Sequence, residues 1–538
     1  MEVITVEILQ RPVTGEDLFD RETLIDTLTK TQKNFALIGA RKSGKTSLMW
    51  EIRPKLEHQG ILCPYIYVLF EDTDTSFLVR YVNLCLFHFL RKKGGKEIPG
   101  IFEDSLETLA EQITQAIELK PQLTKHLLKL REALVKPPDL GTLEMVLKLP
   151  AALTADEDFR FMIMIDEFQN VSTLSLPVPD VLRRQIMTET RVNYLAAGSE
   201  VGMMKDLLES GAAPLFGHFS IQRVGAFDID QARLYILEML KKQHLVIGET
   251  GLSFIVTLTG GFPFFINGIL ENVIMECNQR SYKRVPNDII IQAIEKVSFH
   301  TDGILYIHFK DTLEKTFNKR NMGKYLSILK AIALGNHSHG KIAAASVIRP
   351  TSLPVYLDFL QMTELTRKTP EGYRLTDPFL EFWLRACLRV QESAALPAQE
   401  KLSTFQAAVR DLLNGIRSQL GKAREAQIRE MFYLSDQYAN TRGGFLADNE
   451  FDLITYKDSQ LILGEIKTGS VTSAEVITFA NKLEQVEQVK EKAVGILFVL
   501  DTIYADALSA AAERSIQVWD IAKINDFRKK LKLEKITI

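Results

Sequence analysis

The chain has 538 residues, of which 46% are apolar and 25% are charged, and its formal net charge is −3. This length is more than one hydrophobic core supports, so we expect about three domains. The balanced charge excludes a general basic field, and any contact with nucleic acid would have to be a local patch.

Cysteine usage and hydropathy predict a soluble, cytoplasmic protein. The cysteines are scattered without a CxxC pair, which argues against a disulfide framework and a structural zinc site. The first residues, MEVITVEILQRP, carry acids where a secretion signal has a basic start. The longest apolar runs, such as YIYVLF, are far too short to cross a membrane, so we expect no membrane partner.

The N-terminal part alternates short apolar runs with helix-like segments, which predicts an α/β domain with a doubly wound parallel sheet over residues 1–227. Residues 76–158 have helical spacing of Leu and Phe, and we interpret them as a helical insertion that forms an appendage on this core. The predicted strands are NFALIGA (34–40), ILCPYIYVLFED (61–72), FRFMIMIDEF (159–168) and VNYLAAGSE (192–200).

Beyond residue 227 the pattern changes. Residues 228–318 read as an all-helical lid domain, and residues 319–390 give three short helices followed by a strand–turn–strand segment, the order of a winged helix. The segment QESAALPAQEK at 391–401 is the expected linker. Residues 402–538 then predict a second α/β domain.

A glycine-rich loop between the first predicted strand and a helix matches GxxxxGK(S/T) without departure. Its backbone N–H groups and the helix N-terminus would cradle phosphates of ATP, Lys45 would bridge the β- and γ-phosphates, and Thr46 would hold Mg²⁺. A chance glycine-rich turn is the alternative. The expected nucleotide-binding residues of the loop are Gly39, Ala40, Arg41, Lys42, Ser43, Gly44, Lys45, Thr46 and Ser47.

Acidic and polar residues end the later strands of the same domain. Asp166 would bind Mg²⁺ and Glu167 would polarise the attacking water, although acids at a strand end also cap helices. Ser199 follows the next strand and is placed to sense the γ-phosphate, with a turn-forming serine as the alternative. Arg191 and Arg223 are the candidates for an arginine finger.

The order of these motifs carries a resemblance. DLFDRETLIDTL, the P-loop, MIDEF, AAGSE, APLFGHF and TGGFPFFI follow one another as in archaeal-type P-loop ATPases of the STAND branch, relatives of the origin-recognition AAA+ ATPases. The resemblance covers about residues 10–385. It implies that Arg21 and Glu22 lie near the base and that Pro263 belongs to the lid closing on adenine. One departure is His218, where such proteins often have Arg, which implies slow or partner-dependent turnover.

STAND-like ATPases usually act as switches, so the resemblance also implies a nucleotide-controlled change of shape that a protein trigger shifts. A homo-oligomer that depends on ATP is a further expectation.

A second chemical site is predicted in the stretch EFDLITYKDSQLILGEIKTG. With a two-residue turn at Asp458–Ser459, antiparallel partners have numbers that sum to 917, so that Asp452 faces Glu465 and Glu450 faces Lys467. The four charged side chains then share one face, with Phe451, Leu453 and Ile466 on the other. Facing carboxylates repel unless a cation lies between them, so we expect Mg²⁺ or Mn²⁺ there, with Lys467 orienting a metal-bound water.

The spacing Asp452-x12-Glu465-Ile466-Lys467 resembles the core of the PD-(D/E)XK nucleases, over about residues 400–538. That family usually adds an acid from a preceding helix. The segment GKAREAQIREMF offers Glu425 for this role, with Glu430 as second choice. Two alternatives stay open: an edge hairpin with a surface ion pair, and a nuclease-like fold that only binds nucleic acid.

The predicted winged helix carries cations at Arg349, Arg367, Lys368 and Arg374, which fits contact with DNA and fits a protein-binding role equally well. The histidines form no metal-binding pattern, and His300 and His308 are expected in packing or capping roles.

The leading hypothesis is an ATP-regulated, metal-dependent DNA nuclease, for example in defence against phage or mobile elements. The alternatives are a non-catalytic ATP-dependent DNA-binding switch, in replication or element maintenance, and an ATP-driven signalling scaffold.

Overall fold

The computed structural model describes residues 14–15, 18–19, 21–94, 121–155, 157–199, 201–317, 321–391, 396–489 and 492–536. These residues form two compact units, one made of residues 1–239, 256–275 and 293–395, the other of residues 240–255, 276–292 and 396–538. The expected boundaries of the lid, the winged helix and the C-terminal domain remain predictions.

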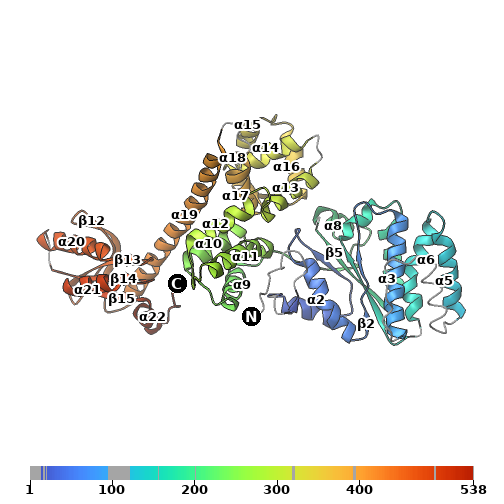
Figure 1. The fold of residues 1–538 in the computed structure, drawn as a ribbon, viewed down its shortest axis with the longest axis horizontal. Helices are drawn as coiled ribbons and strands as arrows, with labels where there is room; N and C mark the ends of the chain where they lie inside the picture. Colours follow the sequence, from blue (N-terminus) through green and yellow to red (C-terminus); the bar gives the residue numbers. More distant parts are fainter. Residues whose placement is uncertain are drawn as a thin grey trace. The chain divides into compact units, whose positions relative to one another are not determined.

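A six-stranded sheet organises the first unit (Figure 1). Its order is β2-β4-β5-β1-β6, with β3 also paired to β4, and the pairs are parallel. Four predicted strand regions contain the first five strands. The edge strand β6 was not predicted, because Ser-Ile-Gln-Arg carries a single apolar residue. The strands are β1 (Phe35–Ile38), β2 (Ile61–Leu62), β3 (Tyr65–Tyr67), β4 (Arg160–Asp166), β5 (Val192–Gly198) and β6 (Ser220–Arg223).

Helices cover both faces of this sheet, because alternate residues of each strand point to opposite sides. Met162 and Met164 of β4 pack on the side of α1 (Glu22–Lys30) and α2 (Lys45–His58). Phe161, Ile163 and Ile165 pack on the other side. The helices of that side are α3 (Asp74–Gly94), α5 (Pro121–Leu134), α6 (Leu140–Thr154) and α7 (Val178–Thr188).

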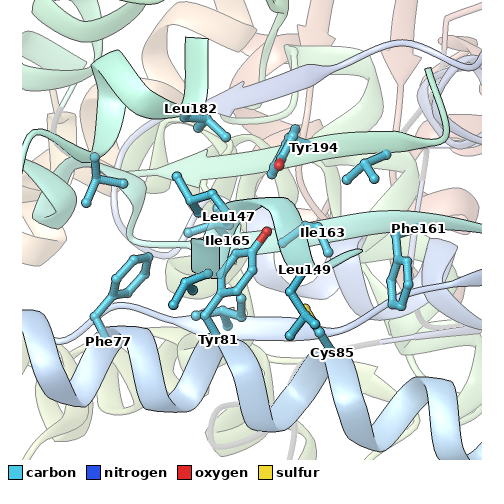
Figure 2. Close-up of a cluster of buried hydrophobic side chains, with 14 of the residues drawn as sticks. Phe77, Tyr81, Cys85, Leu147, Leu149, Phe161, Ile163, Ile165, Leu182 and Tyr194 are labelled. Carbon is cyan, nitrogen blue, oxygen red and sulfur yellow. The ribbon is translucent and has the colours of Figure 1, made fainter. Parts of the chain in front are cut away.

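The interpretation of residues 76–158 as an appendage is corrected by this packing. Tyr81 and Cys85 of α3 point toward Ile163 of β4, and Leu149 of α6 joins the same buried core (Figure 2). The apolar spacing of these helices therefore faces the central sheet rather than a core of their own. Residues 95–120 lie outside the described part of the chain.

The helical region expected at 228–318 is helical apart from a short parallel pair, β7 (Val246–Ile247) and β8 (Arg284–Val285). The region after it has three helices followed by an antiparallel hairpin, β9 (Thr366–Thr369) and β10 (Gly372–Leu375). This is the predicted element order, and its assignment as a winged helix stays a prediction. The helices are α9 (Ile229–Lys242), α10 (Glu249–Thr259), α11 (Pro263–Gln279), α12 (Asn287–Ser298), α13 (Ile304–Thr316), α14 (Met322–Ala333), α15 (His339–Ser346), α16 (Leu353–Met362) and α17 (Pro378–Trp383).

The C-terminal sheet has the order β11-β12-β13-β14-β15, antiparallel through β13 and parallel beyond it. The helix α19 (Ala398–Tyr433) precedes it and begins inside the expected linker. The remaining elements are β11 (Ala439–Leu446), β12 (Asn449–Lys457), β13 (Gln460–Lys467), α20 (Ser473–Val489), β14 (Ala493–Val499), α21 (Ala505–Glu513), β15 (Gln517–Asp520) and α22 (Ile521–Lys530).

Four short elements complete the description. They are the 3-10 helix Phe168–Thr173, α8 (Val201–Leu208), the π-helical turn Leu384–Leu388 and α18 (Arg389–Gln391). Among the residues described, none of the helices has the length and apolar character that crossing a membrane requires.

Candidate functional site

The P-loop lies between the carboxyl end of β1 and the first turn of α2. A Cβ on Gly39 would lie 1.9 Å from the carbonyl oxygen of Val224, so only glycine fits there. Gly44, the N-cap of α2, has a φ of 95°, which glycine adopts without strain. The Ser43 hydroxyl is buried without a hydrogen-bond partner. This cradle and its unsatisfied hydroxyl fit a phosphate group at the helix N-terminus.

Lys45 lies inside the loop and is only 5% exposed. Its Nζ donates hydrogen bonds to the carbonyl oxygens of Gly39 at 2.8 Å and Ala40 at 2.9 Å. Burial lowers the pKa of Lys45 to about 8, and the carboxylates of Glu167 and Asp166 oppose this shift. The loop therefore holds a buried cation that a phosphate anion would stabilise.

Asp166 and Thr46 meet at the carboxyl edge of the sheet. By strand alternation Asp166 lies on the face of Met162 and Met164, which α2 covers. Thr46 Oγ1 donates to Asp166 Oδ2 at 2.7 Å, and the backbone N–H of Glu167 donates to Oδ1 at 2.9 Å. A threonine hydroxyl and a carboxylate at this distance can together hold a hydrated Mg²⁺.

The structure adds Tyr65 to this pair, which sequence reasoning missed. Its hydroxyl also donates to Asp166 Oδ2, at 2.7 Å. The parallel pairing of β3 with β4 places Tyr67 beside Asp166 and Tyr65 beside Met164. A tyrosine near the end of the strand that flanks the acidic strand was the available signal.

Glu167 lies next to Asp166 in a left-handed conformation, with a φ of 51°. Its Oε2 accepts hydrogen bonds from Ser199 Oγ at 2.7 Å and from Gln169 Nε2 at 2.5 Å. The predicted water-polarising acid and the predicted phosphate sensor are thus in direct contact. Gln169 is a further residue that the sequence did not reveal, since nothing marks it apart from its place two residues after Glu167.

Arg21 and Pro263 approach a shared loop. Arg21 Nη2 donates to the carbonyl oxygen of Gly225 at 2.8 Å, and its guanidinium lies 5.4 Å from the ring centre of Phe227. The N–H of Phe227 donates to the carbonyl oxygen of Gly261 at 2.9 Å, just before Pro263 opens α11. Glu22 is the first residue of α1, directly after Arg21.

The P-loop also contacts α11, which packs against α13. Lys42 Nζ lies 5.1 Å from the ring centre of Phe264, and the ring of His308 lies 5.0 Å from the same ring. Burial lowers the pKa of His308 to about 4, and the cations of Lys42 and Arg41 lower it further. His308 therefore has the expected packing role, whereas His300 is half exposed and lies 3.3 Å from Glu295.

The two arginines suggested as fingers lie at opposite edges of the sheet. Arg191 precedes β5, at the edge opposite to the P-loop, and donates to the carbonyl oxygens of Thr154 and Glu157. Arg223 ends β6 and forms an ion pair with Glu209 at 2.6 Å. His218 precedes β6 and is partly buried. Arg223 pairs with Ile38, the residue before the P-loop, so it lies at the P-loop edge of the sheet, and its role as an arginine finger stays a prediction.

In the C-terminal hairpin the predicted register is confirmed from Leu453–Gly464 to Lys457–Gln460, partners whose numbers sum to 917. Asp458 and Ser459 both have positive φ, 49° and 67°, as a type I′ turn requires.

The predicted faces are wrong further along the hairpin. The pairing of β12 with β11 contains a β-bulge. Three residues of β12, from Phe451 to Ile454, lie opposite a step of only two residues in β11. Phe451 therefore packs in the core with Phe479, while Leu453 packs in the opposite core with Ile466. Glu450 pairs with Phe445 of β11, and the ladder between β12 and β13 ends at Leu453–Gly464, before it reaches Glu450 and Lys467.

Charged groups still gather at the open end of the hairpin. Asp452 Oδ2 accepts the backbone N–H of Ile466 at 2.8 Å. Glu465 Oε1 lies 3.2 Å from Lys467 Nζ, and its Oε2 lies 2.9 Å from Nζ of Lys482, a residue of α20 that sequence reasoning missed. We call Glu425, Arg429, Asp452, Glu465, Lys467 and Lys482 the C-terminal charged cluster.

The helix α19 brings Glu425 to this cluster. Arg429 Nη1 donates to the carbonyl oxygen of Asp452 at 2.9 Å and lies 3.5 Å from Glu425 Oε2. Burial raises the pKa of Asp452 to about 6, with further contributions from Glu465 and Glu425. Glu430 instead lies 3.6 Å from Arg528 of α22.

Within the described part of the chain, no group of three or more His, Cys, Asp or Glu side chains is placed to hold a metal ion. The two lysines and the Ile466 N–H engage Glu465 and Asp452 instead. Asp452 and Glu465 as ligands of Mg²⁺ or Mn²⁺ therefore stay a prediction.

The cations of the helix–hairpin region differ in exposure. Arg349, Arg367 and Lys368 are exposed, and Arg374 forms an ion pair with Glu371 at 2.7 Å.

Comparison with known proteins finds structural neighbours but no sequence family. No family model and no curated protein sequence matches the chain. The Walker-type ATPase PABY2304 of Pyrococcus abyssi is 19% identical, with a TM-score of 0.47, over 70% of this chain and 98% of that one. The ORC2 protein of Aeropyrum pernix is 12% identical, with a TM-score of 0.43, over 75% and 97%. The RuvB Holliday junction branch migration motor of Thermotoga maritima is 14% identical, with a TM-score of 0.32, over 68% and 95%.

Acid should weaken the packing of His308 against α11. In the unfolded chain a histidine binds a proton near pH 6.5, whereas folded His308 does so only near its pKa of about 4, so the free energy of unfolding falls as the pH falls through this window. We expect His308→Asn to remove on the order of 1–2 kcal/mol of this acid sensitivity. Thermal melts from pH 7 to 4.5 measure it, with His300→Asn as control. Equal acid sensitivity of His308→Asn and wild type would contradict it.

Proposed function

We propose that this chain is an ATP-binding and ATP-hydrolysing switch that controls a C-terminal nucleic-acid-processing domain. The observation that carries the proposal is the convergence of Lys45, Thr46 and Asp166 at the carboxyl edge of one parallel sheet. Ligands of open parallel sheets bind at this edge, in the crevice beyond the strand ends.

Each residue of the nucleotide site has a role. The loop from Gly39 to Ser47 binds the phosphates through its backbone N–H groups, and Lys45 neutralises their charge. Thr46 and Asp166 hold Mg²⁺, whose bound charge screens the phosphate oxygens. Glu167 accepts a proton from the attacking water, and Ser199 and Gln169 fix the orientation of its carboxylate.

The switch would act through α11. Arg21 and Pro263 flank the loop at Phe227, and Lys42 lies over Phe264. A nucleotide in the P-loop would therefore change the contacts between the P-loop and α11. A ligand shifts a population of conformations only by binding one of them more tightly, and these contacts provide that difference. A protein trigger and ATP-dependent self-association belong to this proposal.

The C-terminal domain is the proposed effector, a DNA nuclease that uses Mg²⁺ or Mn²⁺. Asp452 and Glu465 would be the metal ligands, Lys467 would stabilise the charged phosphate in the transition state, and Glu425 would assist from α19. Lys467 and Lys482 now engage Glu465, so the proposed site needs a rearrangement before a metal ion can enter.

A non-catalytic ATP-dependent DNA-binding switch is the second candidate. The lysines of the C-terminal charged cluster favour it, because they could also contact the phosphate groups of DNA. The hypothesis of an ATP-driven signalling scaffold requires that the protein neither binds nor cleaves DNA.

Substitutions in the P-loop and at the end of β4 should separate binding from turnover. Lys45→Ala removes the buried cation, so we expect at least a tenfold loss of ATP affinity. Glu167→Gln should bind ATP as wild type does and lose at least a hundredfold in hydrolysis, because the amide cannot accept the proton. Filter binding and phosphate release measure the two effects. Wild-type turnover in Lys45→Ala would refute the nucleotide site.

The nuclease is tested with plasmid DNA in Mg²⁺ or Mn²⁺, with and without ATP. We expect the wild type to cleave the plasmid and Asp452→Ala to leave it intact. In Lys45→Ala, adding ATP should no longer change the amount of cleavage. Glu450→Ala is the matched control, because Glu450 is an exposed acid of the same strand. Identical products from wild type and Asp452→Ala would contradict the nuclease hypothesis. DNA binding without cleavage would favour the second candidate.

A further inference from the structure

Tyr65 occupies an unusual place beside the proposed magnesium site. It begins β3, directly after Pro64, whose missing N–H interrupts the edge between β2 and β3. Its side chain packs on the α1 and α2 face, as do Met162 and Met164 of β4. Asp166 Oδ2 thus accepts two hydroxyl groups, those of Tyr65 and Thr46, each at 2.7 Å.

The surroundings of Tyr65 keep this hydroxyl as a donor. Burial raises the pKa of Tyr65 well above its usual value, and the charge of Asp166 raises it further. The ring packs against Trp50 of α2, with ring centres 5.4 Å apart. Phenylalanine would fill the same volume, so the hydroxyl serves the hydrogen bond and not the packing.

We propose that Tyr65 is a positioning residue that sets the Mg²⁺ affinity of the nucleotide site, an inference that rests on the proposed ATP binding. Three hydrogen bonds, from Tyr65, Thr46 and the Glu167 N–H, fix the Asp166 carboxylate. Without Tyr65 the Oδ2 atom keeps only Thr46, whose oxygen must also face the metal ion. Groups that orient a ligand in this way typically change metal affinity tenfold to a hundredfold.

The test compares Tyr65→Phe with wild type in the full chain. The probe is a fluorescent ADP analogue, titrated first in EDTA and then at rising Mg²⁺ concentrations. In EDTA we expect equal affinity for the two proteins. With Mg²⁺, the variant should need about ten to a hundred times more of the ion for the same gain in affinity.

Tyr67→Phe is the matched control, because Tyr67 lies two residues along the same strand and is 45% exposed. It should behave as wild type does. Thermal melts show that each variant is folded, and binding of the fluorescent ADP analogue reports the metal-dependent change without any turnover.

Two outcomes would overturn the inference. An unchanged Mg²⁺ midpoint in Tyr65→Phe would show that the hydroxyl does not position Asp166. An equal loss of affinity with and without Mg²⁺ would show a packing role instead. A wild-type protein that binds no nucleotide either in EDTA or at saturating Mg²⁺ would refute the proposed ATP site itself, which the wild-type titrations show separately.

Discussion

The hydrogen bond from Thr46 to Asp166 is the contact on which the account of the first unit depends. It joins the first turn of α2 to the end of β4, two strands away from β1 across the sheet. It can form because all these strands are parallel, so that their carboxyl ends meet at one edge, and because alternation turns Asp166 toward α2. A shift of β4 by one residue would turn Asp166 to the opposite face and remove the site.

Buried charged side chains favour anion binding at the carboxyl edge of the sheet. Lys45 is almost fully buried and is held by two carbonyl oxygens, and Asp166 is held by three donors. Burying such charges costs stability unless opposite charges or hydrogen bonds offset it. A nucleotide phosphate with its Mg²⁺ would complete the compensation. The C-terminal charged cluster differs, because its lysines already balance Glu465.

Local patterns carried much of the sequence prediction. Short apolar runs predicted the four regions that hold β1 to β5, the P-loop motif predicted its glycines and Lys45, and the two-residue turn at Asp458–Ser459 predicted the hairpin register. What failed depended on tertiary contacts. The packing of α3 on the sheet, the bulge that separates Phe451 from Leu453, and the roles of Tyr65, Gln169 and Lys482 arise from partners distant in the chain, which periodicity does not encode.

Hydrogen exchange with and without ATP and Mg²⁺ tests the central claim most directly. If the loop between β1 and α2 binds the phosphates, the amides from Gly39 to Ser47 should exchange more slowly in saturating ATP, and the peptide that contains Asp166 and Glu167 should follow only when Mg²⁺ is present. Unchanged exchange of the Gly39–Ser47 amides in saturating ATP would contradict the account.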